Sequence, residues 1–287
     1  MGHKLDLSDF RAQRSVLDPD DFALGSEEPD PPPTDLISED VWNGIMTLPD
    51  DVAIRTTSYQ GSRIEMLHDL WSGWVSSMPS KGILSDATYD IADDLKAALF
   101  NLAHGFYKQT IAACRNALEM IVFACDCELN SDFQRWQSWQ QGSGTLNFQQ
   151  SCRRIAANQR LKQLESNGQE TYGNNRSLLP IDNNVDSRRS AWITNLYSRL
   201  CEFAHPRGTN AQLWESNGPI YSAKGMRISF YSYLETYSAL ILMSKIAIAK
   251  FQVPVIASVL YSADSIQQYL PKEFHDVSAY YSDKLTR

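Results

Sequence analysis

The sequence predicts an all-α protein, in which a helical bundle follows an extended, acidic and Pro-rich N-terminal arm. Apolar residues recur at three- and four-residue steps over long stretches, a spacing that lines one face of a helix. No segment shows a serious competing alternation of apolar and polar residues, which a half-buried strand would need. With 287 residues, 43% of them apolar, the chain can bury one large core or two modest ones. We expect residues 1–60 to form the arm, 61–270 the helical domain and 271–287 a polar tail.

The arm is expected from its charge and its prolines. Residues 1–60 hold 13 acidic and 4 basic side chains, a net charge of −9. Pro31, Pro32 and Pro33 are consecutive, and such a run excludes helix and favours an extended, polyproline-like segment. The arm is either a solvated leader or an acidic segment that meets a partner protein or covers a basic region.

The expected helices follow from apolar stripes and from the breakers between them. The first begins near Ser62 and ends at the break between Pro79 and Gly82. Gly105 separates the next two, which form a helical hairpin or one kinked helix. The helix over residues 227–251 is apolar nearly all round, so we expect it at the centre of the bundle. Further helices are expected at residues 85–105, 106–124 and 148–164, and after residue 254.

A polar region, residues 131–187, interrupts these stripes and is rich in Gln, Ser and Asn. Within it, residues 166–186 are expected to form a long loop, and loops of this length in compact domains are usually functional or mobile. Trp136, Trp139 and Trp192 can stack on nucleic-acid bases, but we favour the alternative that they belong to the core.

Neither a metal nor a cofactor is expected. The cysteines are odd in number and show no CxxC spacing: Cys114, Cys125, Cys127, Cys152 and Cys201. We interpret them as reduced, buried thiols. Cys201 and His205 are four residues apart, as two metal ligands on a helix can be, but no second pair completes a site. No glycine-rich loop that would hold phosphates is visible either.

The largest concentration of reactive side chains lies at the end of one predicted helix. That helix carries Arg199, Glu202 and His205, and Pro206 and Gly208 end it. A proline disfavours the α conformation of the residue before it, so His205 is expected at the helix terminus. Six residues separate the arginine from the histidine by about 120° on a regular helix. The two therefore converge only if the helix unwinds before the proline.

Basic residues surround this stretch, although the whole chain has a net charge of −8. Residues 153–207 hold 9 basic and 5 acidic side chains, a net charge of +4. Local charge decides whether a phosphate is attracted, whereas the total argues against non-specific coating of nucleic acid. The candidate nucleic-acid ligands are Arg153, Arg154, Arg188, Arg189 and Arg207.

A second polar pair lies within the helix expected at residues 106–124. Arg115 and Glu119 are four residues apart, so they share a face, and that face adjoins the apolar stripe. A buried ion pair is costly unless it is well bonded. The pair is either an intrahelical salt bridge at the edge of the core or part of a polar network that orients His205 across the bundle.

The pattern Arg199-x5-His205 on a late helix resembles the R-x4-6-H motif of the HEPN superfamily. The segment from Leu200 to Pro206, together with Gly105-Phe106-Tyr107 and Arg115-x3-Glu119, also looks like HEPN-like proteins of bacterial defence neighbourhoods. The resemblance covers roughly residues 85–250. It implies a HEPN-like helical bundle and a role in toxin–antitoxin, abortive-infection or antiphage systems.

The resemblance also implies a chemistry. Active members of the superfamily cleave RNA without a metal, usually with two motifs facing each other across a homodimer. Carried over, His205 would act as acid and base for attack by the RNA 2′-hydroxyl, and Arg199 would stabilise the pentavalent phosphate. Glu202, three residues from each, is the third candidate and can neutralise the arginine.

Three functions therefore remain open. The first is a metal-independent ribonuclease that acts on RNA as a dimeric effector. It is held in check by phage sensing or by a protein partner or antitoxin bound through the arm. The second is a non-catalytic HEPN-like interaction or regulatory subunit of a defence complex. The third is nucleotide or small-molecule binding between the helices.

The expected setting is the cytoplasm. The N-terminus lacks a charged and then apolar leader. The longest uncharged apolar run, from Thr236 to Ser244, is far shorter than the ~20 residues that a membrane span requires.

Overall fold

A computed structural model describes residues 38–159, 161–162, 177–180, 191–204 and 219–248. These residues are almost entirely helical, and the only extended pairing described among them is an isolated parallel bridge between Ser177 and Ala191. The all-α prediction is therefore confirmed for this part of the chain. The predicted residues Arg188, Arg189, His205 and Arg207 lie outside it, as do residues 1–37 and 249–287. The chain divides into two units between Asp51 and Val52.

The predicted arm is helical from residue 39 onward, so its expected extended character is wrong for residues 39–60. Helix α2 (Glu39–Trp42) begins at Ser38, whose Oγ accepts a hydrogen bond from the Val41 amide at 3.3 Å. A π-helical turn, η2 (Asn43–Thr47), and helix α3 (Leu48–Ser76) follow. Because α3 begins well before Ser62, the helical domain does not start where its apolar stripe starts.

Side-chain hydrogen bonds explain how this polar stretch of α3 stays helical. The hydroxyls of Thr56, Thr57 and Ser58 donate to backbone carbonyls four residues earlier, at 2.7–2.9 Å. Such bonds satisfy polar side chains within a helix and tend to bend it. A bend follows at Gln60, whose φ and ψ are −133° and 18°. The predicted stripe begins just after this kink.

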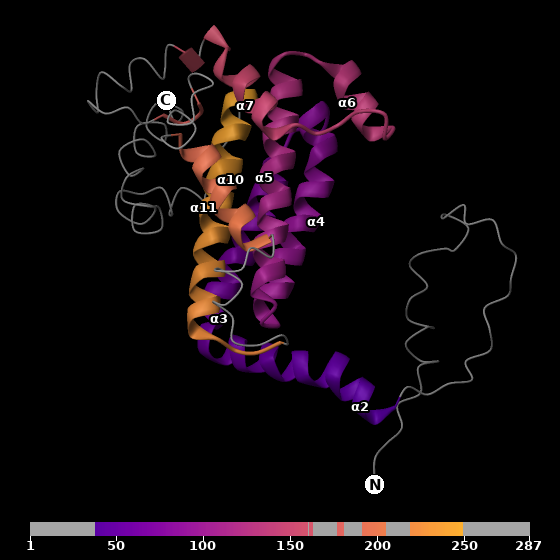
Figure 1. Cartoon of the computed structure of the whole chain (residues 1–287), viewed down its shortest axis with the longest axis vertical. Helices are drawn as coiled ribbons and strands as arrows, with labels where there is room; N and C mark the ends of the chain where they lie inside the picture. Colours follow the sequence, from indigo (N-terminus) through magenta and orange to yellow (C-terminus); the bar gives the residue numbers. More distant parts are fainter. Residues whose placement is uncertain (1–37, 160, 163–176, 181–190, 205–218, 249–287) are drawn as a thin grey trace, which may run out of the picture. The chain divides into compact units, whose positions relative to one another are not determined.

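The core of the second unit is built around helix α5 (Tyr107–Leu129). This helix contacts α4 (Ile83–Ala103) and α11 (Ala223–Ala247), as well as three shorter helices. In the view of Figure 1, α5 lies between α4 and α11. The predicted helices at 85–105, 106–124 and 227–251 are thus confirmed, with shifts of a few residues at their ends. Helix α11 is buried on nearly every side from Tyr233 to Ile246, as its composition predicts.

The later part of α3 also packs into this core. Leu67, Leu70 and Trp74 are fully buried. The Trp74 indole donates to Ser244 Oγ on α11 at 3.2 Å, and the Trp71 indole donates to the Ala92 carbonyl on α4 at 3.1 Å. The apolar stripe of the first predicted helix therefore faces the bundle, as its spacing indicates.

The hairpin between α4 and α5 turns at Gly105. This residue has φ +79°, a left-handed conformation that glycine adopts without steric cost. The Phe106 amide donates to the Asn101 carbonyl at 2.8 Å, and the Gly105 amide donates to Leu102 at 3.3 Å. These two bonds make the Schellman motif that commonly ends a helix.

Two short helices lie in the region predicted to be polar. Helix α6 (Phe133–Gln140) begins at Asp132 as N-cap and has no counterpart among the predicted helices. Helix α7 (Phe148–Ala156) begins at Asn147 as N-cap and is shorter than the expected helix over residues 148–164. A turn follows at Ala157 and a bend at Asn158, a residue type that favours turns because its side chain competes for backbone hydrogen bonds.

Aromatic and apolar residues of the same region belong to the core. Trp136 and Trp192 are buried, and Trp136 packs against Phe123 and Trp139 with ring centroids 5.8 and 5.0 Å apart. The interpretation of these tryptophans as core residues is confirmed, and base stacking is wrong for the two buried ones. Within the expected loop 166–186, residues 177–180 are also buried.

All five cysteines are free thiols, and all but Cys201 are buried. Burial raises the pKa of the Cys114 and Cys127 thiols to about 12, so both stay protonated at neutral pH. The prediction of buried thiols is confirmed for the four. None of the described helices has the length and apolar content to cross a bilayer.

Asp94 on α4 gives the second unit a pH-dependent stability. Burial raises the pKa of this carboxyl from an ordinary 3.8 to about 6; Asn116 opposes the shift by hydrogen bonding, and Asp90 and Asp93 add to it. Folding therefore favours the protonated form, so the contribution of Asp94 to stability is fully present below pH 3.8 and is lost as pH rises through about 6. Asp94→Asn is expected to raise the melting temperature more at pH 8 than at pH 4 in thermal unfolding followed by circular dichroism. An equal change at both pH values would contradict this.

Candidate functional site

The site predicted at the end of α10 (Trp192–Ala204) is anchored by Arg199. Its Nε donates to Asn195 Oδ1 at 2.9 Å, and its Nη2 makes an ion pair with Glu235 Oε1 on α11. The Trp192 indole donates to the same carboxylate oxygen at 2.8 Å. Residues 192, 195 and 199 recur at three- and four-residue steps, so they lie on one face of the helix. This face is directed at Glu235.

Glu235 is the counter-ion of Arg199 and is not among the residues predicted for the site. Its side chain is 3% exposed, whereas that of Arg199 is 37% exposed. A carboxylate buried this deeply is costly unless a charge and hydrogen bonds compensate it, and Arg199 and Trp192 provide both. The arginine is therefore fixed from the buried side while part of it remains accessible. The sequence does hold one sign of this role: Glu235 is the single acidic residue of the most apolar helix, and a buried acid needs a partner.

Of the other two residues in the predicted catalytic set, Glu202 lies within the described residues and His205 lies outside them. Glu202 lies on α10 and is exposed. It was expected to neutralise Arg199, but the ion pair that the structure gives the arginine is with Glu235. His205 is the residue after Ala204, with which the described part of α10 ends. Its role stays a prediction.

Arg115 and Glu119 form the intrahelical salt bridge that their spacing predicts. Arg115 Nη2 donates to Glu119 Oε1 at 2.7 Å and approaches the Tyr197 hydroxyl at 3.1 Å. That hydroxyl donates in turn to Glu119 Oε1. Burial, followed by the hydrogen bond to Glu119, raises the pKa of Tyr197 well above its ordinary value, so the hydroxyl keeps its proton. The pair therefore extends across to α10.

The Tyr197 ring is also fixed by packing. It stacks on Phe148 of α7, with ring centroids 4.0 Å apart and planes 17° apart. Arg115 Cζ lies 5.4 Å from the centre of the Tyr197 ring, within the range of a cation–π contact. Together with Arg199 and Glu235, these contacts hold α10 to α5, α7 and α11.

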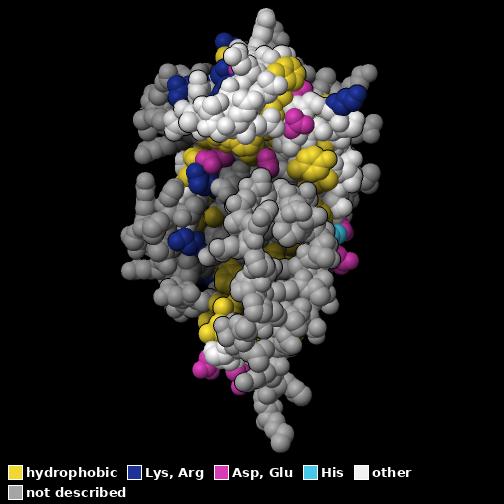
Figure 2. Space-filling view, turned by 90° about the vertical axis from the view of Figure 1, so that its right-hand side faces the viewer, with side chains coloured by type: hydrophobic (Ala, Val, Ile, Leu, Met, Phe, Trp, Pro, Cys, Tyr) yellow, Lys and Arg dark blue, Asp and Glu magenta, His cyan; other side chains and the backbone are white. Residues whose placement is uncertain are grey.

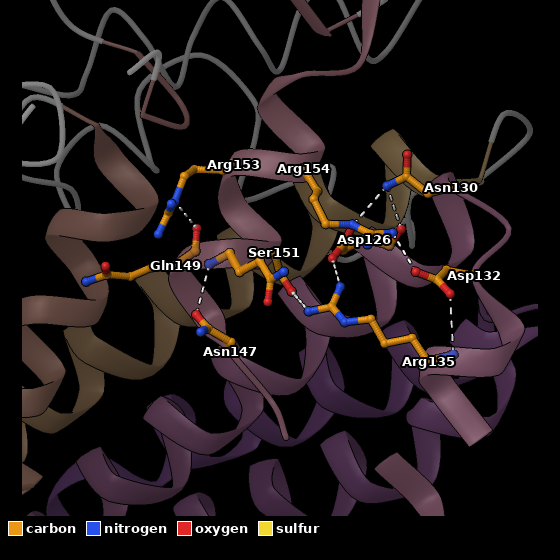
Figure 3. A network of polar contacts seen from close by, with 10 residues as sticks. Asp126, Asn130, Asp132, Arg135, Asn147, Gln149, Ser151, Arg153 and Arg154 are labelled. Carbon is orange, nitrogen blue, oxygen red and sulfur yellow. Dashed lines mark hydrogen bonds and ion pairs between the residues drawn. The ribbon is translucent and has the colours of Figure 1, made fainter. Parts of the chain in front are cut away.

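Arg154, a predicted nucleic-acid ligand, belongs to a polar network centred on Asp126 of α5 (Figure 3). The Asp126 side chain is fully buried and accepts bonds from Arg135, from Arg154 Nε at 2.9 Å and from Asn130 Nδ2 at 2.8 Å. Arg154 Nη2 bonds Asp132 Oδ2 at 2.6 Å. This network ties α5 to α6 and α7.

Arg154 and its neighbour Arg153 differ in their availability to an external phosphate. Arg154 is committed to two carboxylates, which neutralise it and reduce its attraction for phosphate. Arg153 is exposed, and its Nε donates to the Gln149 carbonyl within α7 at 3.2 Å. Of these two predicted ligands, Arg153 has the placement that contact with an external phosphate requires.

The charged side chains of the described residues are mixed on the face drawn in Figure 2. Lys and Arg atoms are scattered over this face, and several stand beside Asp or Glu atoms. Within the described ranges, no three His, Cys, Asp or Glu side chains are grouped so that they can hold a metal ion. Of the basic residues counted along 153–207, the described ones are Arg153, Arg154, Lys162 and Arg199, and the basic surface expected from the count stays a prediction.

No protein-family model, curated protein or solved structure matches the chain. Its function is therefore inferred from its own residues and their arrangement.

Proposed function

We propose that the chain is an HEPN-like effector of a bacterial antiphage or toxin–antitoxin system that cleaves RNA without a metal. The proposal includes a homodimer in the cytoplasm, restrained by a protein partner or antitoxin. One observation supports it above the others. Arg199, the arginine of the R-x4-6-H motif, is held at two nitrogens from the buried side while its side chain stays 37% exposed. A rigid, accessible guanidinium suits a developing phosphate charge.

The proposed reaction divides the work between the two motif residues. His205 removes the proton of a ribose 2′-hydroxyl, because an imidazole titrates near neutral pH. The 2′-oxygen then bonds to the adjacent phosphorus, and the bond to the 5′-oxygen of the next nucleotide breaks. Arg199 stabilises the negative charge on the pentavalent phosphate. The products carry a 2′,3′-cyclic phosphate and, after proton return, a 5′-hydroxyl.

The test compares variants of the purified full chain on RNA, with the product ends identified by mass spectrometry. Cleavage is expected to leave 2′,3′-cyclic phosphates, and His205→Ala is expected to lower the rate by about 10²- to 10⁴-fold, the usual contribution of a general acid–base group. Arg199→Ala is expected to lose cleavage as well. His68→Ala is the matched control, because His68 is an exposed histidine on α3. A wild-type chain that leaves RNA intact, or an active His205→Ala variant, would end the proposal.

A second function, a non-catalytic interaction or regulatory subunit, is favoured by a different observation. The arginines of the predicted polar groups pair with carboxylates, and these contacts join α10 to its neighbours: Arg115 with Glu119 and Tyr197, Arg199 with Glu235. Ion pairs that link packed helices are commonly structural. In this case His205→Ala is expected to lower the melting temperature markedly, without any ribonuclease activity to lose. Full thermal stability of the variant would count against it.

A further inference from the structure

We infer that Glu235 is a positioning residue, which fixes the direction in which the Arg199 guanidinium faces a scissile phosphate. The inference rests on the proposed ribonuclease function and adds to it a residue outside the R-x4-6-H motif. Glu235 lies on α11, 36 residues beyond the arginine that it bonds. It does not need to touch RNA to act, because it works through Arg199.

The first step is the rigidity of the carboxylate. Glu235 Oε1 accepts bonds from both Trp192 Nε1 and Arg199 Nη2. Trp192 is fully buried, so its indole cannot follow a moving acid without disturbing the core. Rotating the carboxylate away from the arginine would therefore break a second, buried hydrogen bond. The acceptor is fixed before any substrate arrives.

The second step is the geometry of the guanidinium. Its nitrogens lie in one plane, in a rigid fork. Asn195 Oδ1 fixes Nε at 2.9 Å, and Glu235 fixes Nη2. Two fixed nitrogens set the plane of the group and with it the direction of Nη1. A donor already aimed at developing charge costs no reorganisation when the reaction occurs.

The third step separates positioning from simple attraction. The negative charge of Glu235 offsets the positive charge of Arg199, so it weakens binding of any phosphate to the arginine in the ground state. A positioning acid therefore raises kcat without lowering KM. A loss of position of about 1 Å can cost on the order of 10²-fold in rate.

The kinetic test uses Glu235→Gln, which keeps the size of the side chain and removes its charge. With RNA as substrate, kcat is expected to fall about 10- to 100-fold, while KM stays unchanged or falls. Trp192→Phe, which removes the second bond to Oε1, is expected to lower kcat less. Asp132→Asn is the matched control: it changes an acid that pairs with Arg154 and should leave kcat unchanged. An unchanged or raised kcat in Glu235→Gln would overturn the inference.

An NMR measurement tests the fixation of Arg199 without cleavage. The Nη–H signals of Arg199, assigned by their loss in Arg199→Lys, include the Nη2 hydrogens that bond Glu235; they are expected to exchange slowly with water in the wild type and faster in Glu235→Gln. Equal exchange in both would refute the inference even if the chain cleaves RNA. Slow exchange in a chain that does not cleave would refute the ribonuclease proposal and, with it, the catalytic role of Glu235. If Glu235→Gln does not fold, Trp192→Phe carries both readouts.

Discussion

Replacing Asp126 by alanine is expected to lower the free energy of unfolding by about 3–5 kcal/mol, the usual cost of breaking a buried ion pair. The Asp126 carboxylate is completely buried and bonds two arginines that come from different helices, Arg135 of α6 and Arg154 of α7. The arginines are only 18% and 35% exposed. Without the acid they would remain partly desolvated beside one another.

Urea unfolding followed by far-UV circular dichroism measures this effect. Asp93→Ala is the control, because Asp93 is 82% exposed and its distance to Lys96 is 4.0 Å; it should change stability by no more than about 0.5 kcal/mol. A loss below about 1 kcal/mol in Asp126→Ala would show that the network in Figure 3 is not a structural centre of the second unit.

Gly105→Ala is expected to destabilise the second unit by about 2–5 kcal/mol, from two sources. The first is the left-handed backbone, with φ +79°. The second is steric: an added Cβ would lie 2.7 Å from the Ile220 carbonyl oxygen and 2.9 Å from Val52 Cγ1. The oxygen belongs to the backbone, so it cannot move aside as a side-chain end would.

Gly142→Ala separates the two sources. Gly142 has φ +72°, and a Cβ added there would meet nothing within 4 Å. It should therefore show only the conformational cost, on the order of 1 kcal/mol. Equal losses of stability in the two variants, measured by urea unfolding, would mean that the contact at Ile220 relaxes freely.

The sequence predicts those helices whose buried faces are set by local spacing. The stripes of α4 and α5 repeat over five or more turns, so their period identifies them without knowledge of their partners. Helix α11 is identified by its length and its nearly all-round apolar composition. Helix α6 has one buried residue, Trp136, and a single apolar position has no period. The beginning of α3 is not predicted for another reason. Its residues Thr56–Ser58 are stabilised by hydrogen bonds from hydroxyls to backbone carbonyls, and the spacing of apolar residues does not reveal such bonds.

The contacts of the candidate site are also predictable from the sequence only where they are local. Arg115 and Glu119 pair within one helix, so their spacing reveals them. Arg199 and Glu235 pair across helices, and a single sequence holds no sign of which helices are neighbours. Counting charge along residues 153–207 misjudges Arg154 for a related reason. The count includes Arg154 as part of a basic surface. It leaves out Asp126, which neutralises this arginine, because Asp126 lies 28 residues away on α5.

The turn at Gly105 also bears on the order of folding. Helices α4 and α5 are adjacent in sequence and joined by a short, tightly bonded connection, so they can meet after closing a very small loop. Chains rich in such near-neighbour contacts fold quickly. Helix α10 depends on partners 36 to 82 residues away, which makes its docking a later event. A freshly made chain would thus hold its hairpin before Arg199 reached Glu235, and any activity of that arginine would appear last.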